Sequence, residues 1–217
     1  MHKQIRIVGT SHIAKSSIEN VKEQFLKFSP DMIAVELDRR RLHSLLTEQQ
    51  PNYSLSLVRV IGVKGYLFAV IGAYLQQKLG KTVGISPGAD MKQGIILARN
   101  NQLQLILMDK DIILTLNKLS KELTTKEKWR FVGDLLFGWM KTQDKIRINL
   151  DEVPNEEIIT TLMAKLKERY PTLYRVLVDD RNKHMAANIA RIAHHHPDKK
   201  ILVIMGAGHK EGFETYL

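Results

Sequence analysis

Short runs of Ile, Val, Leu and Met recur along this chain, separated by longer segments with helical periodicity. Four runs have the length and composition of buried β-strands, and they cover residues 5–8, 31–35, 103–108 and 201–205. Between the first two runs, apolar residues recur at one-face helical spacing, at positions 18, 21, 25 and 28. This alternation predicts an α/β fold, with a mainly parallel β-sheet flanked by helices.

Residues 112–177 interrupt the alternation, because they contain helical patterns and no strand-like run. Within them, Trp129, Val132, Leu136 and Trp139 form a helical stripe that we expect to serve packing. A chain of 217 residues has room for one large domain. We therefore predict a single domain over residues 1–217, with a helical insert or cap at residues 112–177.

Residues 55–79 form the most apolar part of the chain. The uninterrupted apolar stretch is too short to span a bilayer, and Arg59 and Lys64 interrupt it on one side. A helix this apolar is buried in the core, in a dimer contact or against a membrane. We favour the first two interpretations, so a homodimer is one expected state.

Composition narrows the chemistry and the partners. The chain has no cysteine, which excludes disulfides and thiolate metal sites and is compatible with the cytoplasmic location that we expect. Residues 1–4 lead directly into the first strand, so we expect no signal peptide. The net charge is +10, but the lysines are spread through helices and are not clustered with aromatic residues. We therefore expect no nucleic-acid partner.

Two of the predicted strands end in the same motif, Gly-x-x-His. The motif stands at residues 9–12 after the first strand and at 206–209 after the last, and Glu36 directly follows the second strand. The carboxyl ends of parallel strands lie along one edge of a sheet, where open α/β folds bind their ligands. We therefore expect His12, Glu36 and His209 to meet there. Two imidazoles and one carboxylate form a candidate metal or acid–base site.

The chain resembles the TraB/PrgY family of pheromone-shutdown proteins, which is related more distantly to Tiki-type proteases and to EreA/ChaN-like proteins. The matching motifs run in order along essentially the whole chain. They are Gly9-Thr10-Ser11-His12, Val35-Glu36-Leu37-Asp38 with Arg41, Pro87-Gly88-Ala89-Asp90-Met91, Asp109-Lys110-Asp111 with Thr115, Asp180-Arg181 with Met185-Ala186, and Gly206-Ala207-Gly208-His209.

This resemblance implies an EreA/ChaN-like α/β fold with paired Gly-x-x-His motifs and a shared acidic residue. The Tiki branch implies metal-dependent peptide hydrolysis, and the TraB/PrgY branch implies the blocking of a peptide pheromone. Asp180 stands where the family usually has glutamate, and Lys110 where it usually has arginine. Many relatives continue into C-terminal membrane helices, so we expect any membrane association to come from a segment absent from this sequence.

The expected chemistry is that of a metal-dependent hydrolase. His12, His209 and Glu36 would hold a divalent ion such as Mn, Co or Zn, with open positions for water and a substrate carbonyl. Glu36 is alternatively the general base. Arg41 and Arg181 would bind a substrate carboxylate or stabilise an oxyanion.

Asp180 is the remaining candidate catalytic residue, and it would pair with either arginine or with a histidine. The expected substrate of the site is a peptide or a small amide. Two alternatives stay open. The first is a non-enzymatic module that binds pheromone-like peptides, and the second, which we rank last, is a haem-binding protein.

Overall fold

The computed structural model describes residues 4–10, 15–47, 59, 62, 88–141 and 156–217. The predicted ligand His12 lies outside the described residues, as does nearly all of the apolar segment 55–79. The expectations attached to them, a metal ligand and a core or dimer helix, therefore stay predictions.

The described strands form one parallel sheet, in the order β1-β4-β2-β3. The strands are β1 (Ile5–Thr10), β2 (Met32–Val35), β3 (Gln104–Leu107) and β4 (Ile201–Gly206). All six residues of β4 are buried, as expected for a central strand that is covered on both faces. The predicted α/β fold is confirmed, and each predicted strand is present.

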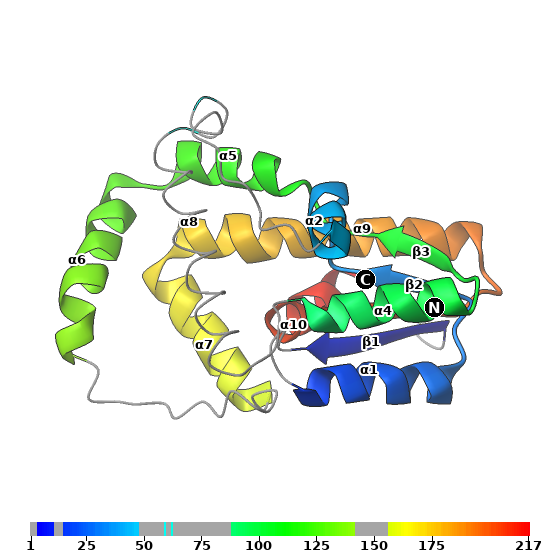
Figure 1. Cartoon of the computed structure of the whole chain (residues 1–217). Coiled ribbons are helices and arrows are strands. Elements are labelled where there is room, and N and C mark those ends of the chain that lie inside the picture. The colour runs from blue at the N-terminus through cyan, green and yellow to red at the C-terminus, as the bar shows by residue number, and fades with distance from the viewer. Residues whose placement is uncertain (1–3, 11–14, 48–58, 60–61, 63–87, 142–155) are drawn as a thin grey trace.

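Helices cover both faces of the sheet and produce three layers (Figure 1). One face packs against α1 (Lys15–Phe28) and α4 (Ala89–Asn100). The opposite face packs against α9 (Asp180–His195) and α10 (Ala207–Tyr216). The layers fix α9 and α10 relative to the strand ends, where the candidate site lies.

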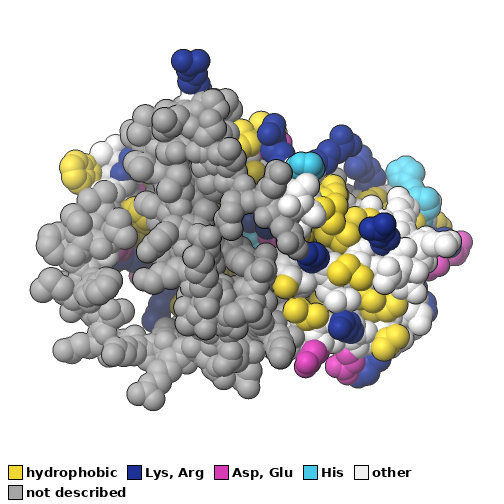
Figure 2. Space-filling model, viewed as in Figure 1, with side chains coloured by type: hydrophobic (Ala, Val, Ile, Leu, Met, Phe, Trp, Pro, Cys, Tyr) yellow, Lys and Arg dark blue, Asp and Glu magenta, His cyan; other side chains and the backbone are white. Residues whose placement is uncertain are grey.

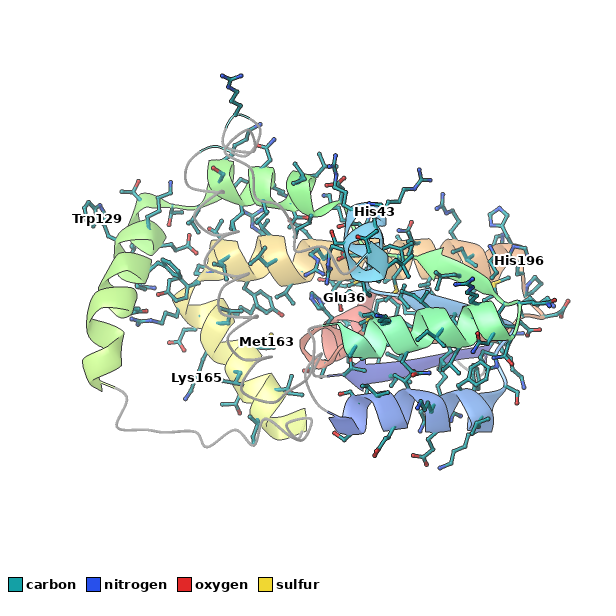
Figure 3. The ribbon with its side chains drawn as sticks, in the orientation of Figure 1. Glu36, His43, Trp129, Met163, Lys165 and His196 are labelled. Atoms are coloured by element: carbon teal, nitrogen blue, oxygen red, sulfur yellow. The ribbon has the colours of Figure 1, made fainter. Side chains whose placement is uncertain are left out.

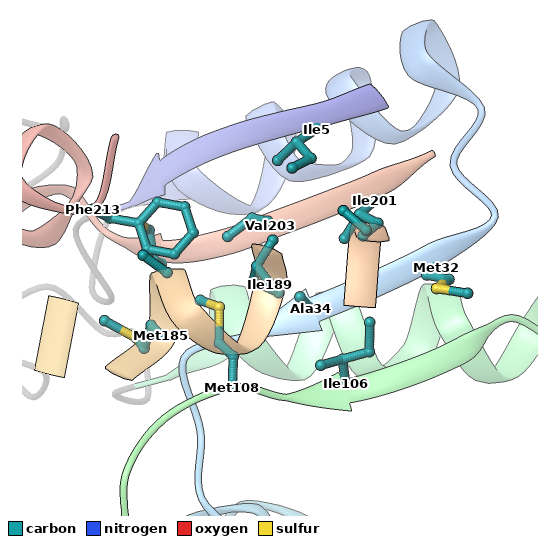
Figure 4. Packing of buried hydrophobic residues seen from close by; sticks show 13 residues of the cluster. Ile5, Met32, Ala34, Ile106, Met108, Met185, Ile189, Ile201, Val203 and Phe213 are labelled. Carbon is teal, nitrogen blue, oxygen red and sulfur yellow. The ribbon is translucent and has the colours of Figure 1, made fainter. Parts of the chain in front are cut away.

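The core between the sheet and α9 is apolar and closely packed. Figure 4 shows Met185 and Ile189 of α9, with Phe213 of α10, lying against Ala34 and Val203 of the sheet. All five residues are fully buried. Complete burial of a Val, Ile, Met or Phe side chain stabilises a fold by about 1.5–3 kcal/mol.

The remaining described helices extend beyond the carboxyl ends of the strands (Figure 1). They are α2 (Arg39–Thr47), α5 (Ile112–Glu122), α6 (Thr125–Lys141), α7 (Glu156–Arg169), α8 (Pro171–Tyr174) and a π-helix, η2 (Arg175–Asp179), that continues into α9. The described part of residues 112–177 is thus helical. Asp111 caps α5, because its side chain accepts a hydrogen bond from the backbone N–H of Ile113.

Helix α6 differs from expectation at Trp129. The stripe on this helix predicts packing, but the Trp129 side chain is 73% exposed. Figure 3 shows it on the side of α6 that faces away from the other helices. The pattern alone did not indicate that α6 lies at the outer end of the helical part, remote from the sheet.

None of the helices in the described ranges combines the length and the apolar character needed to cross a bilayer. Figure 2 shows Lys and Arg side chains distributed over several elements of the visible face. The expectation that nucleic acid is not a partner stays a prediction.

Candidate active site

Two carboxylate residues and one glycine stand at the carboxyl edge of the sheet, after neighbouring strands. Glu36 follows β2, and its backbone N–H donates to the carbonyl of Ile204 in β4 at 3.0 Å. Asp109 follows β3 in the same way, with its N–H directed at the Leu37 carbonyl at 3.3 Å. Gly206 ends β4 and is the N-cap of α10. The sheet topology therefore brings both carboxylates to one place.

Arg181, in the first turn of α9, connects the two carboxylates. Its Nη2 donates to Glu36 Oε1 and to Asp109 Oδ2, each at 2.6 Å, and its Nε donates to Asp109 Oδ1 at 3.0 Å. Its Nη1 donates to the Leu177 carbonyl at 3.0 Å and lies 3.1 Å from His209 Nε2. A guanidinium has five N–H donors, so each donor of Arg181 has an acceptor.

The contact with Arg181 matches one tautomer of His209. A guanidinium donates hydrogen bonds and accepts none, so Nε2 of His209 must carry a lone pair. Its other nitrogen, Nδ1, lies 2.7 Å from Oδ1 of Asn182 and therefore carries the proton. Asn182, the residue after Arg181 on α9, thus orients the His209 ring.

Glu36 is held at both of its oxygens. Oε1 accepts from Arg181, and Oε2 accepts from the backbone N–H of Gly206 at 2.7 Å. Because Gly206 begins α10, the carboxylate lies at the positive end of that helix dipole. The Glu36 side chain is only 3% exposed, so its charge depends on these partners.

Electrostatics keep the guanidinium charged in this buried position. Burial lowers the pKa of Arg181, but the charges of Glu36 and Asp109 and their hydrogen bonds raise it by more, so the net shift is upward. Arg41 adds a second cation, with Nη1 at 3.0 Å from Asp109 Oδ2. The two carboxylates and two guanidinium groups balance in charge.

Helix α2 is set in place by Asp38. Its Oδ1 accepts from the backbone N–H groups of Arg40 and Arg41 at 2.7 and 2.9 Å, which caps the helix. Its Oδ2 accepts from the N–H of Ile112 at 3.1 Å, the first residue of α5. One carboxylate thus joins two helix starts and directs Arg41 toward Asp109. The anion near Arg41 is an internal carboxylate, and the side chain remains about one third exposed.

The Asp180 side chain bonds to Lys118 and to none of the site residues described above. Its Oδ2 lies 2.7 Å from Lys118 Nζ of α5, and both side chains are partly exposed. Its hydrogen-bond partner is thus a lysine, whereas the sequence suggested an arginine or a histidine. The predicted catalytic role of Asp180 stays a prediction.

The pair Glu36 and His209 fits the requirements of a divalent ion. Glu36 Oε1 and His209 Nε2 lie 3.4 Å apart, roughly the separation of two ligands that are each about 2.0–2.2 Å from a tetrahedral ion. The His209 tautomer leaves the Nε2 lone pair available for coordination, and an N–H···O partner behind a histidine is typical of metal ligands.

A larger ligand set is not assembled within the described residues. No group of three or more His, Cys, Asp or Glu side chains is arranged there to hold a metal ion. Arg181 lies between Glu36 and Asp109 and bonds to both. A complete site would need a further ligand, the role predicted for His12.

A groove lies beside β1 and α10, the helix that carries His209. It has a volume of about 440 Å³ and is lined by residues of β1, α1, α7 and α10. Ile159 and Met163 contribute apolar surface from α7, and Ala207 and Gly208 line the groove beside His209. Figure 3 places Met163 on α7, between that helix and α10. An extended chain segment in this groove would lie along the edge strand β1.

Two residues of the cluster were not among the predicted site residues. Asp109 carried a usable signal, because it directly follows the strand-like run 103–108, just as Glu36 directly follows the run 31–35. Asn182 carried no comparable signal, since its contact with His209 depends on how α9 packs against α10. Of the predicted site residues, the structure brings Glu36, Arg41, Arg181 and His209 into one connected cluster.

Comparisons with known proteins match nearly the whole chain. The model of the TraB/PrgY/gumN family matches residues 2–217. An uncharacterized protein of Methanocaldococcus jannaschii is 36% identical over 221 residues, an alignment that covers 98% of this chain and 53% of that protein. The chain therefore spans about half the length of this curated relative. With nearly every residue inside the family match, the chain belongs to the TraB/PrgY/gumN family.

Proposed function

We propose that this protein is a metal-dependent hydrolase that cleaves a peptide or a similar amide bond. The observation that carries the proposal is the pairing of Glu36 Oε1 and His209 Nε2 at 3.4 Å, with the His209 tautomer set by Asn182. These two residues would hold the ion, together with His12 as the predicted third ligand. When bound, a divalent ion supplies Lewis acidity and lowers the pKa of water.

The protein groups around the pair have distinct tasks in this proposal. Glu36, with Oε2 fixed by Gly206, holds its carboxylate in one orientation, either as a ligand of the ion or, alternatively, as the general base for the attacking water. Arg181, anchored on Asp109, donates to the carbonyl oxygen of the substrate as negative charge develops there. Arg41 is the more exposed guanidinium and orients a carboxylate of the substrate.

The groove along β1 is the proposed path of the substrate. A peptide is long and narrow, and an edge strand binds such a chain through its main-chain groups. Gly208, the residue before His209, lines the groove, and in this proposal a peptide bound there extends to the Glu36–His209 pair.

The test uses chelator-treated protein reconstituted with Mn, Co or Zn. We expect a stoichiometric ion in the wild type, its loss in Glu36→Gln and His209→Ala, and cleavage of members of a broad peptide library that follows metal content. Unchanged metal content and unchanged turnover in both variants would refute the proposal. Peptide binding without cleavage under any of the three metals would favour the non-enzymatic binding module instead.

A further inference from the structure

The cation already present in the candidate site is Arg181. Its guanidinium bonds to Glu36 Oε1 at 2.6 Å and lies 3.1 Å from His209 Nε2. These are the same two atoms that would coordinate a divalent ion. Both side chains are almost completely buried, at 3% and 11% exposure, and the Arg181 side chain is also 11% exposed.

Two cations cannot use these atoms together. The lone pair of His209 Nε2 accepts from Arg181 or coordinates an ion, but it has no second in-plane lone pair for the other. A guanidinium and a divalent ion a few ångströms apart also repel each other strongly at a buried position. Any ion that binds Glu36 and His209 must therefore displace the guanidinium from both.

Arg181 has partners that survive such a displacement. Its Nε and Nη2 bond to the two oxygens of Asp109, and Nη1 donates to the Leu177 carbonyl in η2. The wide turn of a π-helix is a frequent feature of functional sites, and here it lies directly before Arg181. Because the guanidinium is rigid, it leaves Glu36 and His209 by shifting together with Asp109, which keeps it beside the site.

We propose that Arg181 is an internal competitor of the metal: it stabilises the metal-free site by occupying Glu36 and His209, and it yields both residues when a divalent ion binds. This inference rests on the proposed function, because it takes the Glu36–His209 pair as the metal site. It adds that the intrinsic metal affinity of the pair is masked in the wild-type chain.

The test is calorimetric titration of Mn²⁺ into the metal-free full chain. We expect Arg181→Gln to bind Mn²⁺ at least 10-fold more tightly than the wild type, because the competing cation is gone. Arg41→Gln also removes a cation from Asp109, but it leaves the two bonds of Arg181 to Glu36 and His209 in place. We expect it to tighten binding by less than about 3-fold. Equal or weaker Mn²⁺ binding by Arg181→Gln would overturn the competition.

A measurement on the wild type covers the case in which Arg181→Gln does not fold. Zn²⁺ is diamagnetic, so NMR can follow the exchange of the arginine side-chain N–H protons during its titration. We expect the Nη protons of Arg181 to exchange faster after Zn²⁺ is added, while those of the control Arg175 on Glu122 are unchanged. Bound Zn²⁺ without any change at Arg181 would contradict the competition. Absence of Mn²⁺ and Zn²⁺ binding in every variant would instead refute the metal site itself, and the inference with it.

Discussion

Gly212 and Asn182 are in direct contact across the interface of α9 and α10. A Cβ atom on residue 212 would lie far inside the van der Waals distance of Asn182 Nδ2. Asn182 in turn accepts the hydrogen bond that orients His209. The absence of a side chain at Gly212 is therefore a condition for the position of His209.

Gly212→Ala is expected to disturb the candidate site from a distance. The added methyl group must displace Asn182 or separate the two helices, and overpacking of this kind costs about 1–3 kcal/mol. We expect this loss in the free energy of unfolding, measured in urea, together with weaker metal binding at His209. The control is Gly133→Ala in α6, where a new Cβ has no neighbour within 4 Å. Helix propensity should make that variant about 0.5–1 kcal/mol more stable.

Glu127 is expected to make the free energy of unfolding fall at acidic pH. Burial raises its pKa, but hydrogen bonds from Thr124 and Thr172 lower it by more, so the net shift is below the ordinary value of 4.5. A carboxyl with a lowered folded-state pKa stabilises the fold above its unfolded pKa. This stabilisation disappears as the pH falls through the folded-state pKa.

We therefore expect Glu127→Gln to lose about 1.5–3 kcal/mol at pH 7, as for hydrogen bonds to a charged group, and to show less acid dependence below pH 4.5 than the wild type. Chemical denaturation across a pH series measures both. Glu23→Gln is the control, because Glu23 forms an exposed pair with Lys27 that contributes about 0.3–0.5 kcal/mol. Equal acid profiles for wild type and Glu127→Gln would contradict the assignment.

Met163→Arg is expected to obstruct the groove along β1. Met163 lies in its wall, and its Sδ and Cε would be 3.4 Å from a Cβ on Gly208. A longer, charged side chain should raise KM for a peptide substrate at least 10-fold and leave metal affinity unchanged. Leu26→Arg is the matched control, since Leu26 is 74% exposed on α1 and does not line the groove. A KM unchanged by Met163→Arg would place the substrate elsewhere.

Asp180→Asn tests the one predicted catalytic residue that points away from the cluster. Its partner is Lys118, so Asp180→Asn and Lys118→Met should each cost less than about 1 kcal/mol, as partly exposed pairs do. If the pair is structural, the two variants should have the same turnover. A much larger loss of turnover in Asp180→Asn than in Lys118→Met would demonstrate a catalytic role for the carboxylate.

The strands were predictable because their runs are rich in apolar residues and end abruptly. Glu36 was found for the same reason, since a residue directly after a buried strand lies at the edge of the sheet. The bond from Arg181 to Glu36 joins residues 145 positions apart, and local pattern does not reveal which acceptor such a side chain selects.

Two further features depend on tertiary structure in the same way. Trp129 belongs to a regular helical stripe, but α6 has no sheet beside it, so the side chain stays exposed. Positive charges at the N-terminus of a helix, such as Arg39, Arg40 and Arg41 in α2, interact unfavourably with the helix dipole. Asp38, just before them, supplies the compensating negative charge and accepts from the backbone N–H groups of Arg40 and Arg41.

The position of β4 in the sheet has a consequence for how the chain acquires its structure. Ile201–Gly206 pairs with β1 on one side and with β2 on the other, so the two earliest strands are not neighbours of each other. During synthesis, β1 cannot pair with β4 until β4 has emerged from the ribosome. Contacts of such long sequence separation form slowly. The nascent protein should therefore depend on chaperones more than a domain whose sheet grows in the order of its sequence.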